Sequence, residues 1–342
     1  MDHPGLRIGF VGAGANTRSR HLPGFRSLPD VSFTVVANRS RESSERVARE
    51  FGIGRVAADW REVVAAPDVD AVCIGTWPYL HAEITQAALW AGKHVLTEAR
   101  MASDVAQAEA MLAESRQHPH LVAQIVPAPL TLTMDALVRG LLQDGTLGEV
   151  REVTVTHATG QCSSADAPRS WRQDRGWSGC NTLSLGIYYE TLLRWLNQDA
   201  AVLAADAAVY TPFRRDPESG QPRPVEAPDT LTVLGRYPAG ARLVMHLSAI
   251  EAGSGRNEIH LNGSRASLRV DLGAGALILT PHGETPRSLA VPALPDAGWR
   301  VEADFVASIR EHRPVRLTDF ETGVRYMRFT EAAWRAWRAV AP

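Results

Sequence analysis

The sequence predicts an α/β protein. Its first part is expected to be a doubly wound parallel sheet of the Rossmann type, and its second part an α/β domain built on an open, mostly antiparallel sheet. Three observations lead to this prediction: short apolar runs alternate with helical segments up to about residue 126, a Gly-x-Gly turn follows the first run, and alternating polar and apolar residues fill much of the second half.

The first apolar run, residues 6–11, leads directly into a Gly-Ala-Gly turn. Such a turn lets the backbone approach a pyrophosphate, and the helix that follows presents its N–H groups and the positive end of its dipole to that charge. The third position of the usual glycine pattern is Thr17, and a glycine-tolerant turn without a ligand has the same appearance. The residues expected to bind a dinucleotide here are Gly12, Gly14, Ala15 and Asn16.

The other elements of the first domain follow the same alternation. The later apolar runs are short, as buried parallel strands are, and glycines follow two of the helical stretches. We place this domain at residues 1–126. The expected strands are 31–37, 70–75, 93–97 and 120–126, and the expected helices are 41–51, 80–91 and 103–116, the last with Ser103 as its N-cap.

The pattern changes near Pro127, and residues 127–342 are expected to form the second domain. Segment 214–228 is rich in proline and is expected to be an exposed loop. The final helix is expected to pack back on the first domain. The expected helices are 131–143, 182–197, 299–312 and 319–340, and the expected strands are 150–157, 201–211, 229–237, 241–250, 256–262, 265–271 and 275–280.

Composition and charge disfavour several classes of function. The chain has 342 residues, is 45% hydrophobic and carries a net charge of −2 without a basic stripe, so nucleic acid and membrane surfaces are not expected partners. No apolar run reaches the roughly 18–20 residues that cross a bilayer. The three cysteines have no metal-ligand spacing, so we expect no metal and a reducing, cytoplasmic location.

Lys93 is the only lysine. Arginine cannot donate or accept a proton near neutral pH, so a mechanism that requires a lysine must use this one. Lys93 stands at the start of the expected strand 93–97, roughly 20 Å from the residues that follow that strand. We therefore expect it to be solvated and to lie outside any active site.

The end of the second strand bears on the choice of cofactor. A carboxylate there would bond the adenosine ribose and favour NAD, but the chain reads Asn38-Arg39-Ser40-Arg41. Asn38 can bond a ribose hydroxyl, and the next three side chains can hold a 2′-phosphate, so we expect NADP in preference to NAD. The alternative is that Ser40 caps a helix and the arginines are solvated.

Several stretches share order and spacing with one known family over nearly the whole chain. They are Ile8–Gly14, His21–Gly24, Gly75–Pro78 followed by His81, Gly92–Leu96, Trp171–Arg172, and Leu185–Ile187 leading to Leu193–Leu196. Together they resemble the glucose–fructose oxidoreductase/inositol dehydrogenase/MocA (Gfo/Idh/MocA) family. The resemblance implies hydride transfer between a nicotinamide and a sugar, cyclitol or related polyol. It also implies a small-molecule substrate and a homo-oligomer, a dimer or tetramer, formed through the second domain's sheet.

Residues at two strand ends are expected near the nicotinamide, because such folds bind ligands at the carboxyl ends of their strands. The alternatives are a plain tight turn after one strand, an ion pair between Glu98 and an arginine, and a capping or packing role for His81. The residues concerned are Thr76, Trp77, Pro78, His81 and Glu98.

The chain departs from the family at each of its usual catalytic positions. The resemblance implies a lysine in Glu-Lys-Pro, and an aspartate and a histidine four residues apart on one face of a helix. Here Ala99 stands at the lysine, Arg100 at the proline, Ser184 at the aspartate and Tyr188 at the histidine. Oxidation of an alcohol needs a base for the hydroxyl proton, so that role must pass to another group.

Three functions remain open. In the first, the chain is a dehydrogenase with Tyr188 as the acid/base, its pKa lowered by nearby arginine or nicotinamide charge. Ser184 then bonds the substrate, Arg100 and Arg172 bind an anionic or carbonyl group, and Trp171 stacks on the substrate.

In the second, a redox-neutral hydratase, lyase, isomerase or glycosidase uses Glu98, Tyr188, Tyr189 or Glu190 as proton carriers. In the third, the chain binds NADP without catalysis.

Overall fold

The computed structural model describes residues 5–253 and 255–340, so the ends of the predicted domains at 1–4 and 341–342 lie outside the described residues. It divides into two compact units, and the last helix contributes residues to both. The units are the described parts of Met1–Pro127 with Arg300–Met327, and of Ala128–Trp299 with Arg328–Pro342.

The first unit contains a six-stranded sheet with strand order β3-β2-β1-β4-β5-β6, in which every pair is parallel. This order confirms the predicted doubly wound fold and places its switch point between β1 and β4, where such sheets bind ligands. The strands are β1 (Leu6–Val11), β2 (Val31–Ala37), β3 (Arg55–Val56), β4 (Ala71–Ile74), β5 (His94–Thr97) and β6 (Ala123–Ile125).

The helices of this unit begin with a π-turn, η1, that continues directly into α1. Asp104 caps α5 by accepting a hydrogen bond from the Gln107 amide at 2.8 Å, so the predicted Ser103 cap is wrong by one residue. Neither the short β3 nor α3 was predicted. The elements are η1 (Thr17–His21), α1 (Leu22–Arg26), α2 (Arg41–Phe51), α3 (Trp60–Ala65), α4 (Pro78–Trp90), α5 (Val105–Gln117), α9 (Val301–Glu311) and the start of α10 (Phe320–Val340).

The second unit contains an eight-stranded sheet with strand order β16-β15-β14-β13-β7-β12-β11-β8. Only β7 and β12 pair in parallel, which confirms the predicted mostly antiparallel sheet. The strands are β7 (Val150–Ala158), β8 (Ala201–Ala208), β11 (Thr230–Arg236), β12 (Arg242–Ser248), β13 (Arg256–Gly263), β14 (Ala266–Asp271), β15 (Ala276–Pro281) and β16 (Arg287–Leu289).

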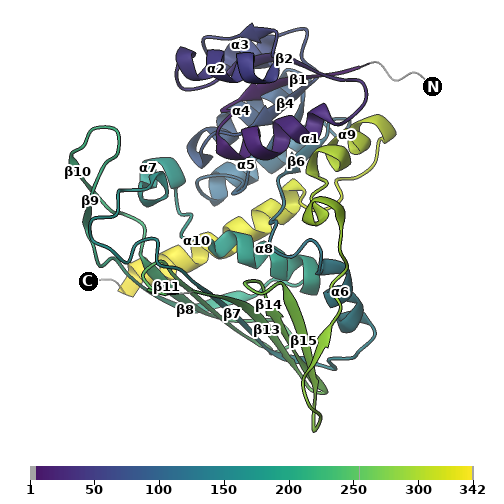
Figure 1. Ribbon diagram of the computed structural model, residues 1–342, viewed down its shortest axis with the longest axis vertical. Helices are drawn as coiled ribbons and strands as arrows, with labels where there is room; N and C mark the ends of the chain where they lie inside the picture. The colour runs from purple at the N-terminus through teal and green to yellow at the C-terminus, as the bar shows by residue number, and fades with distance from the viewer. Residues whose placement is uncertain (1–4, 254, 341–342) are drawn as a thin grey trace. The chain divides into compact units, whose positions relative to one another are not determined.

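Helix α8 (Leu185–Leu196) and the second part of α10 lie on one face of this sheet (Figure 1). Val153 and Val155 alternate along β7 with less buried residues and are fully buried, as a strand with one covered face requires. The remaining elements of the unit are α6 (Asp135–Gln143), η2 (Trp171–Gln173), α7 (Arg175–Ser178) and η3 (Pro295–Gly298).

The prediction that the proline-rich segment 214–228 is an exposed loop is wrong in part. Its first part pairs as a two-stranded ribbon, β9 (Phe213–Arg215) with β10 (Pro222–Pro224). The Arg214 side chain is fully buried between the ribbon and the preceding loop, where it donates hydrogen bonds to three backbone carbonyls and lies 3.8 Å from the Asp229 carboxylate. A buried guanidinium is tolerated here because both of its terminal nitrogens donate to carbonyls, although Nε has no hydrogen-bond partner among the described residues.

Candidate functional site

The glycine turn after β1 has the geometry that a bound pyrophosphate requires. Gly12 has φ +76°, and a Cβ on it would lie 2.6 Å from the Thr76 backbone nitrogen, so only glycine fits. The Ala13 amide donates to Asn38 Oδ1 at 2.6 Å, which holds the turn against the end of β2. A Cβ on Gly14 would meet nothing closer than 3.8 Å, so the chain leaves the outer side of the turn open.

The helix that follows the turn starts at Ala15 and Asn16 and passes into the π-turn of η1. The Arg18 amide donates to the Gly14 carbonyl at 3.0 Å, which closes the first helical turn. Amides ahead of that bond have no partner within the helix and favour an anion. The turn and helix start therefore fit a dinucleotide phosphate.

A pocket of about 410 Å³ lies beside this turn, between the ends of β1, β2 and β4. Asp59, Trp60 and Tyr79 also line this pocket, although the sequence did not predict them. Asp59 and Trp60 were missed because they follow β3, a strand too short to give an apolar run. The predicted cofactor residues that line the pocket are Gly12, Gly14, Asn38, Arg39, Thr76 and Trp77. Those that do not line it are Ala15, Asn16, Ser40, Pro78, His81 and Glu98.

At the β2 end of the pocket, the Arg39 guanidinium lies over the Trp77 ring, 5.6 Å from its centroid. The Asn38 amide is bonded within the chain, because its Nδ2 donates to Ser43 Oγ at 3.0 Å while its Oδ1 holds the turn. Ser40 caps α2 by accepting from the Ser43 amide at 3.2 Å, which is the structural role considered as its alternative. Arg39 is thus the predicted side chain at this end that remains at the pocket surface.

His81 has a structural position. Its ring is fully buried, with Nε2 2.9 Å from the Thr76 carbonyl oxygen and Nδ1 3.0 Å from that of Arg100. Burial lowers the pKa of His81 more than these hydrogen bonds raise it. The ring links the turn after β4 to the segment after β5, and Pro78 is the buried first residue of α4.

Glu98, at the end of β5, belongs to a buried ionic cluster. His21 is fully buried with Nε2 3.0 Å from Glu98 Oε1 and Nδ1 2.5 Å from Glu302 Oε1, and Asn16 also donates to Glu98 Oε1. Burial lowers the pKa of His21, but the hydrogen bonds to Glu302 and Glu98 outweigh it and raise the pKa to about 9. Burial raises the pKa of Glu98, but the hydrogen bonds from His21 and Asn16 outweigh it and lower the pKa.

The partner of Glu98 is therefore an imidazolium rather than the arginine considered from the sequence. Both contacts use Oε1, so Oε2 is the oxygen with which Glu98 can accept a hydroxyl group. Arg100, two residues on, has a side chain that is 6% exposed, and the peptide bond before it is cis.

The expectation that Lys93 is solvated is wrong in part, because its side chain is bonded within the protein. Its Nζ donates to the carbonyl oxygens of Ala66 at 3.0 Å and Val69 at 2.7 Å. Ala66 is the C-cap residue of α3, and Val69 lies in the loop that follows α3. The lysine therefore has a structural role at the amino end of β5.

In the second unit, Tyr188 occupies the second turn of α8 and is 1% exposed. Its hydroxyl donates to Asn257 Oδ1 on β13 at 2.5 Å, and its ring lies 5.1 Å from that of His157 on β7. Burial raises the pKa of Tyr188 well above its usual value, more than the bond to Asn257 lowers it. The prediction of a lowered pKa is wrong within this unit, because the phenol lies in an apolar layer beside an amide.

The neighbours of Tyr188 on α8 have different surroundings. Ser184 precedes the helix, is half-buried and makes no side-chain capping bond, while its carbonyl accepts from the Tyr188 amide. Tyr189 stacks on Phe329 with ring centroids 3.8 Å apart, and Glu190 is bonded to Arg194 at 2.8 Å. The last two are held by packing and an ion pair, so they are poorly placed as proton carriers.

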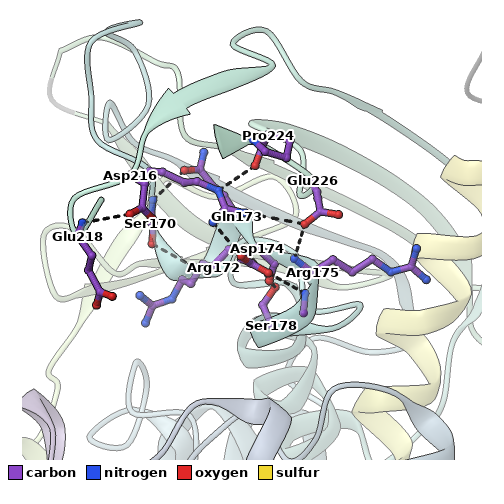
Figure 2. A network of polar contacts seen from close by, with 12 residues as sticks. Ser170, Arg172, Gln173, Asp174, Arg175, Ser178, Asp216, Glu218, Pro224 and Glu226 are labelled. Carbon is purple, nitrogen blue, oxygen red and sulfur yellow. Dashed lines mark hydrogen bonds and ion pairs between the residues drawn. The ribbon is translucent and has the colours of Figure 1, made fainter. Parts of the chain in front are cut away.

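Trp171 and Arg172 lie in η2, and the Arg172 guanidinium lies 4.4 Å from the centroid of the Trp171 ring. Figure 2 shows the Arg172 guanidinium pointing away from the polar network around Gln173 and Asp174. That network depends on Arg169, a nearly buried residue that the sequence analysis did not select, which donates to Asp174 Oδ2 and to the Pro224 carbonyl, each at 2.8 Å.

Within the described residues, no group of three or more His, Cys, Asp or Glu side chains is arranged to hold a metal ion. Among the same residues, no helix has the length and apolarity needed to traverse a bilayer. Cys73, Cys162 and Cys180 form no disulfide within the part of the chain that the structure describes.

Comparison with known proteins agrees with this geometry. Residues 6–124 match the family model described as an oxidoreductase family with an NAD-binding Rossmann fold, which defines the class of the first unit. Residues 136–269 match the model of the GFO/IDH/MocA C-terminal domain. The chain belongs to the Gfo/Idh/MocA oxidoreductase family, and the resemblance seen in its motifs is confirmed.

Two curated relatives illustrate the level of similarity. The chain is 28% identical to dTDP-3,4-didehydro-2,6-dideoxy-alpha-D-glucose 3-reductase of Streptomyces antibioticus over 93% of this chain and 92% of the relative. It is 26% identical to levoglucosan dehydrogenase of Pseudarthrobacter phenanthrenivorans over 75% of this chain and 71% of the relative.

Solved structures share the fold over almost the whole chain. An oxidoreductase domain protein from Kribbella flavida has a TM-score of 0.88 at 25% identity, covering 99% of this chain and 98% of that protein. A levoglucosan dehydrogenase in complex with NADH and L-sorbose has a TM-score of 0.87 at 21% identity, covering 98% and 97%.

Proposed function

We propose that the chain is an NAD(P)-dependent dehydrogenase or reductase of a sugar, a cyclitol or a related polyhydroxy or carbonyl compound. The main support is the open Gly12–Gly14 turn beside its pocket, in a chain of this family. One relative is named as a dehydrogenase of levoglucosan and another as a reductase of a dTDP-linked deoxysugar, which favours this substrate class.

When bound, the nicotinamide supplies the site that accepts or donates hydride. The chain's own residues bind and orient the nucleotide and the substrate. The backbone at Gly14 and the helix start after it receive the pyrophosphate, and Glu98 Oε2 accepts a ribose or substrate hydroxyl. On the substrate side, we propose that Ser184 bonds a hydroxyl, Trp171 packs on the substrate, and Arg172 and Arg100 bind an oxygen-rich group.

The direct test is nucleotide binding and turnover by the purified chain. Quenching of tryptophan fluorescence by NADH or NADPH, and nicotinamide reduction with a panel of polyols and aldoses, are expected. If neither nucleotide binds, the proposal is wrong. Turnover without net change in the nicotinamide supports the redox-neutral alternative, and tight binding without turnover supports a non-catalytic nucleotide-binding protein.

We also propose that NADP is preferred to NAD. No carboxylate follows β2, and the Asn38 amide is bonded to Ala13 and Ser43, so Arg39 is the side chain of this segment best placed for a 2′-phosphate. Replacing Arg39 with Ala should weaken NADPH binding about tenfold or more, by loss of a charge-assisted bond, and change NADH binding little. Arg49→Ala, at an exposed arginine on the following helix α2, is the control. Equal losses for both nucleotides would contradict this preference.

We propose that the sheet of the second unit mediates homo-oligomerisation. Leu203 on β8 and Leu234 on β11 are 59% and 41% exposed, and β8 is an edge strand. Light scattering should show a dimer or tetramer that Leu234→Arg dissociates, whereas a monomeric parent chain would contradict the proposal. Three cysteines that form no disulfide among the described residues fit a reducing compartment, and we propose a cytoplasmic location on that ground.

A further inference from the structure

The covered face of the second unit's sheet changes from apolar to polar at one register. On β7, the buried Val153 and Val155 are followed on the same face by His157. On β13, Asn257 lies directly opposite His157, and Ile259 lies opposite Val155. The polar pair therefore ends the apolar layer beneath α8, at the end of β7 and the start of β13.

Tyr188 completes this group from the helix side. Its hydroxyl donates to Asn257 Oδ1 at 2.5 Å, and Asn257, directly opposite His157 in the sheet, acts to raise the pKa of the imidazole. The two rings lie 5.1 Å apart and are tilted by 38°. We call His157, Asn257 and Tyr188 the β7–α8 cluster.

His157 has an unused ring nitrogen. Its Nδ1 is buried and, among the residues that the structure describes, has no hydrogen-bond partner. A buried imidazole nitrogen without a partner is costly, so such groups call for an explanation such as a ligand or a catalytic role. The imidazole as a whole is half-buried, unlike the Tyr188 ring.

Nearby side chains offer weaker alternatives as proton acceptors. Tyr188 donates its proton to an amide oxygen, and Tyr189 Oη accepts from the Ala200 amide at 2.7 Å. Glu190 accepts from the Ala128 amide at 3.0 Å and pairs with Arg194, so it is held as a buried, satisfied carboxylate. The single lysine is bonded in the other unit.

We propose that His157, rather than the Tyr188 phenol, accepts the substrate's hydroxyl proton, and that Asn257 and Tyr188 position its imidazole. This inference rests on the proposed dehydrogenase function. In oxidation, the O–H bond of the alcohol breaks and its proton moves to the imidazole. The carbinol C–H bond breaks with its electron pair leaving as hydride to the nicotinamide, so the alcohol is oxidised and the nicotinamide reduced. In reduction, the imidazolium returns the proton.

The protonation state of His157 suits this role. Burial lowers its pKa, more than the hydrogen bond to Asn257 raises it, so the ring is neutral near pH 7 and can accept a proton. Tyr188 is the titratable side chain in contact with it, and it remains a neutral phenol because burial raises its pKa. His157 on β7 then takes the proton-accepting role for which the family resemblance implies a histidine at position 188.

The test compares His157→Gln with Tyr188→Phe in the full chain. His157→Gln should lower kcat/KM for alcohol oxidation by about 10² or more, the range of a lost general base, while leaving nucleotide binding unchanged. Tyr188→Phe removes only a positioning bond, so it should lower kcat about tenfold and move the acidic limb of the pH profile. His282→Gln, an exposed histidine after β15, is the matched control.

A second measurement uses histidine-labelled protein and NMR. The His157 resonance, identified by its loss in His157→Gln, should titrate below the ordinary 6.5 and coincide with the acidic limb of kcat/KM. The titration should shift in Tyr188→Phe, because the Asn257 amide loses its partner.

The outcomes separate this inference from the proposed function. Turnover retained in His157→Gln and abolished in Tyr188→Phe would overturn the inference alone and restore the phenol as acid/base. A parent chain that binds no nucleotide, or that oxidises no polyol and reduces no carbonyl compound, would overturn the proposed function and this inference with it.

Discussion

Glu302→Gln should reveal the energy stored in the buried cluster around His21. The substitution removes one of two carboxylates that hold the imidazolium, while an amide of almost the same shape fills the space beside Gly24, where a Cβ would lie 2.6 Å from Glu302 Oε2. The raised pKa of His21, about 9 against 6.5, corresponds to about 3 kcal/mol of folding free energy, since each unit is worth about 1.4 kcal/mol.

The sign of the pH dependence follows from the direction of that shift. Because the pKa of His21 is raised in the folded chain, its contribution is complete below pH 6.5 and is lost as the pH rises through about 9. We expect Glu302→Gln to lower the free energy of unfolding by up to about 3 kcal/mol below pH 6.5, since it breaks one of the two buried pairs and leaves the one with Glu98. Above pH 9, where the imidazole is neutral in both proteins, the loss should be small.

The assay is urea unfolding of the parent and the variant at matched pH values on either side of this window. Glu83→Gln is the control, because Glu83 forms an exposed pair with Arg61, and such pairs contribute little. If the difference in the free energy of unfolding between Glu302→Gln and the parent persists unchanged above pH 9, the assignment of a buried imidazolium is refuted. The same holds if Glu83→Gln shows the same pH-dependent loss as Glu302→Gln.

Three further predictions follow from contacts described above. Gly12→Ala should abolish NADPH binding in calorimetry, because its φ of +76° and its 2.6 Å approach to Thr76 exclude a Cβ; unchanged affinity would contradict the turn geometry. Asn16→Ala should start acid unfolding at a higher pH, because Asn16 helps to lower the pKa of Glu98, whose contribution is complete above about 4.5 and is lost as the pH falls. Arg214→Met should lower the free energy of unfolding, measured with denaturant, by about 3–5 kcal/mol, since it leaves Asp229 buried without its cation. A loss well below about 1 kcal/mol would show that the pair is dispensable.

The first unit was largely predictable because its strands are buried on both faces and therefore appear as apolar runs. β1, β2, β4 and β5 lie where such runs predicted them, and α2 has the predicted bounds, 41–51. β3 was missed because two residues give no periodicity, and with it the pocket residues Asp59 and Trp60.

The substrate side was harder to predict because its polar groups come together only through tertiary pairing. His157 and Asn257 are 100 residues apart, and each continues an apolar alternation, so neither is conspicuous in the sequence. The prolines near Arg214 predict an exposed loop. In the structure, the Arg214 guanidinium donates hydrogen bonds to carbonyls about 50 residues away in the sequence and lies in the interior. The helix position of Tyr188 was identified from the family motif, but its acidity depends on neighbours that the motif does not specify.

The bonding of Lys93 has a practical consequence for chemical modification. Its ammonium group is the chain's only side-chain amine, and two carbonyl oxygens already bind it. Lysine acetyltransferases therefore have one partly shielded target, next to the amino end of β5, whereas the glycine turn lies at the carboxyl ends of the same parallel strands. Modification of this lysine should leave nucleotide affinity unchanged.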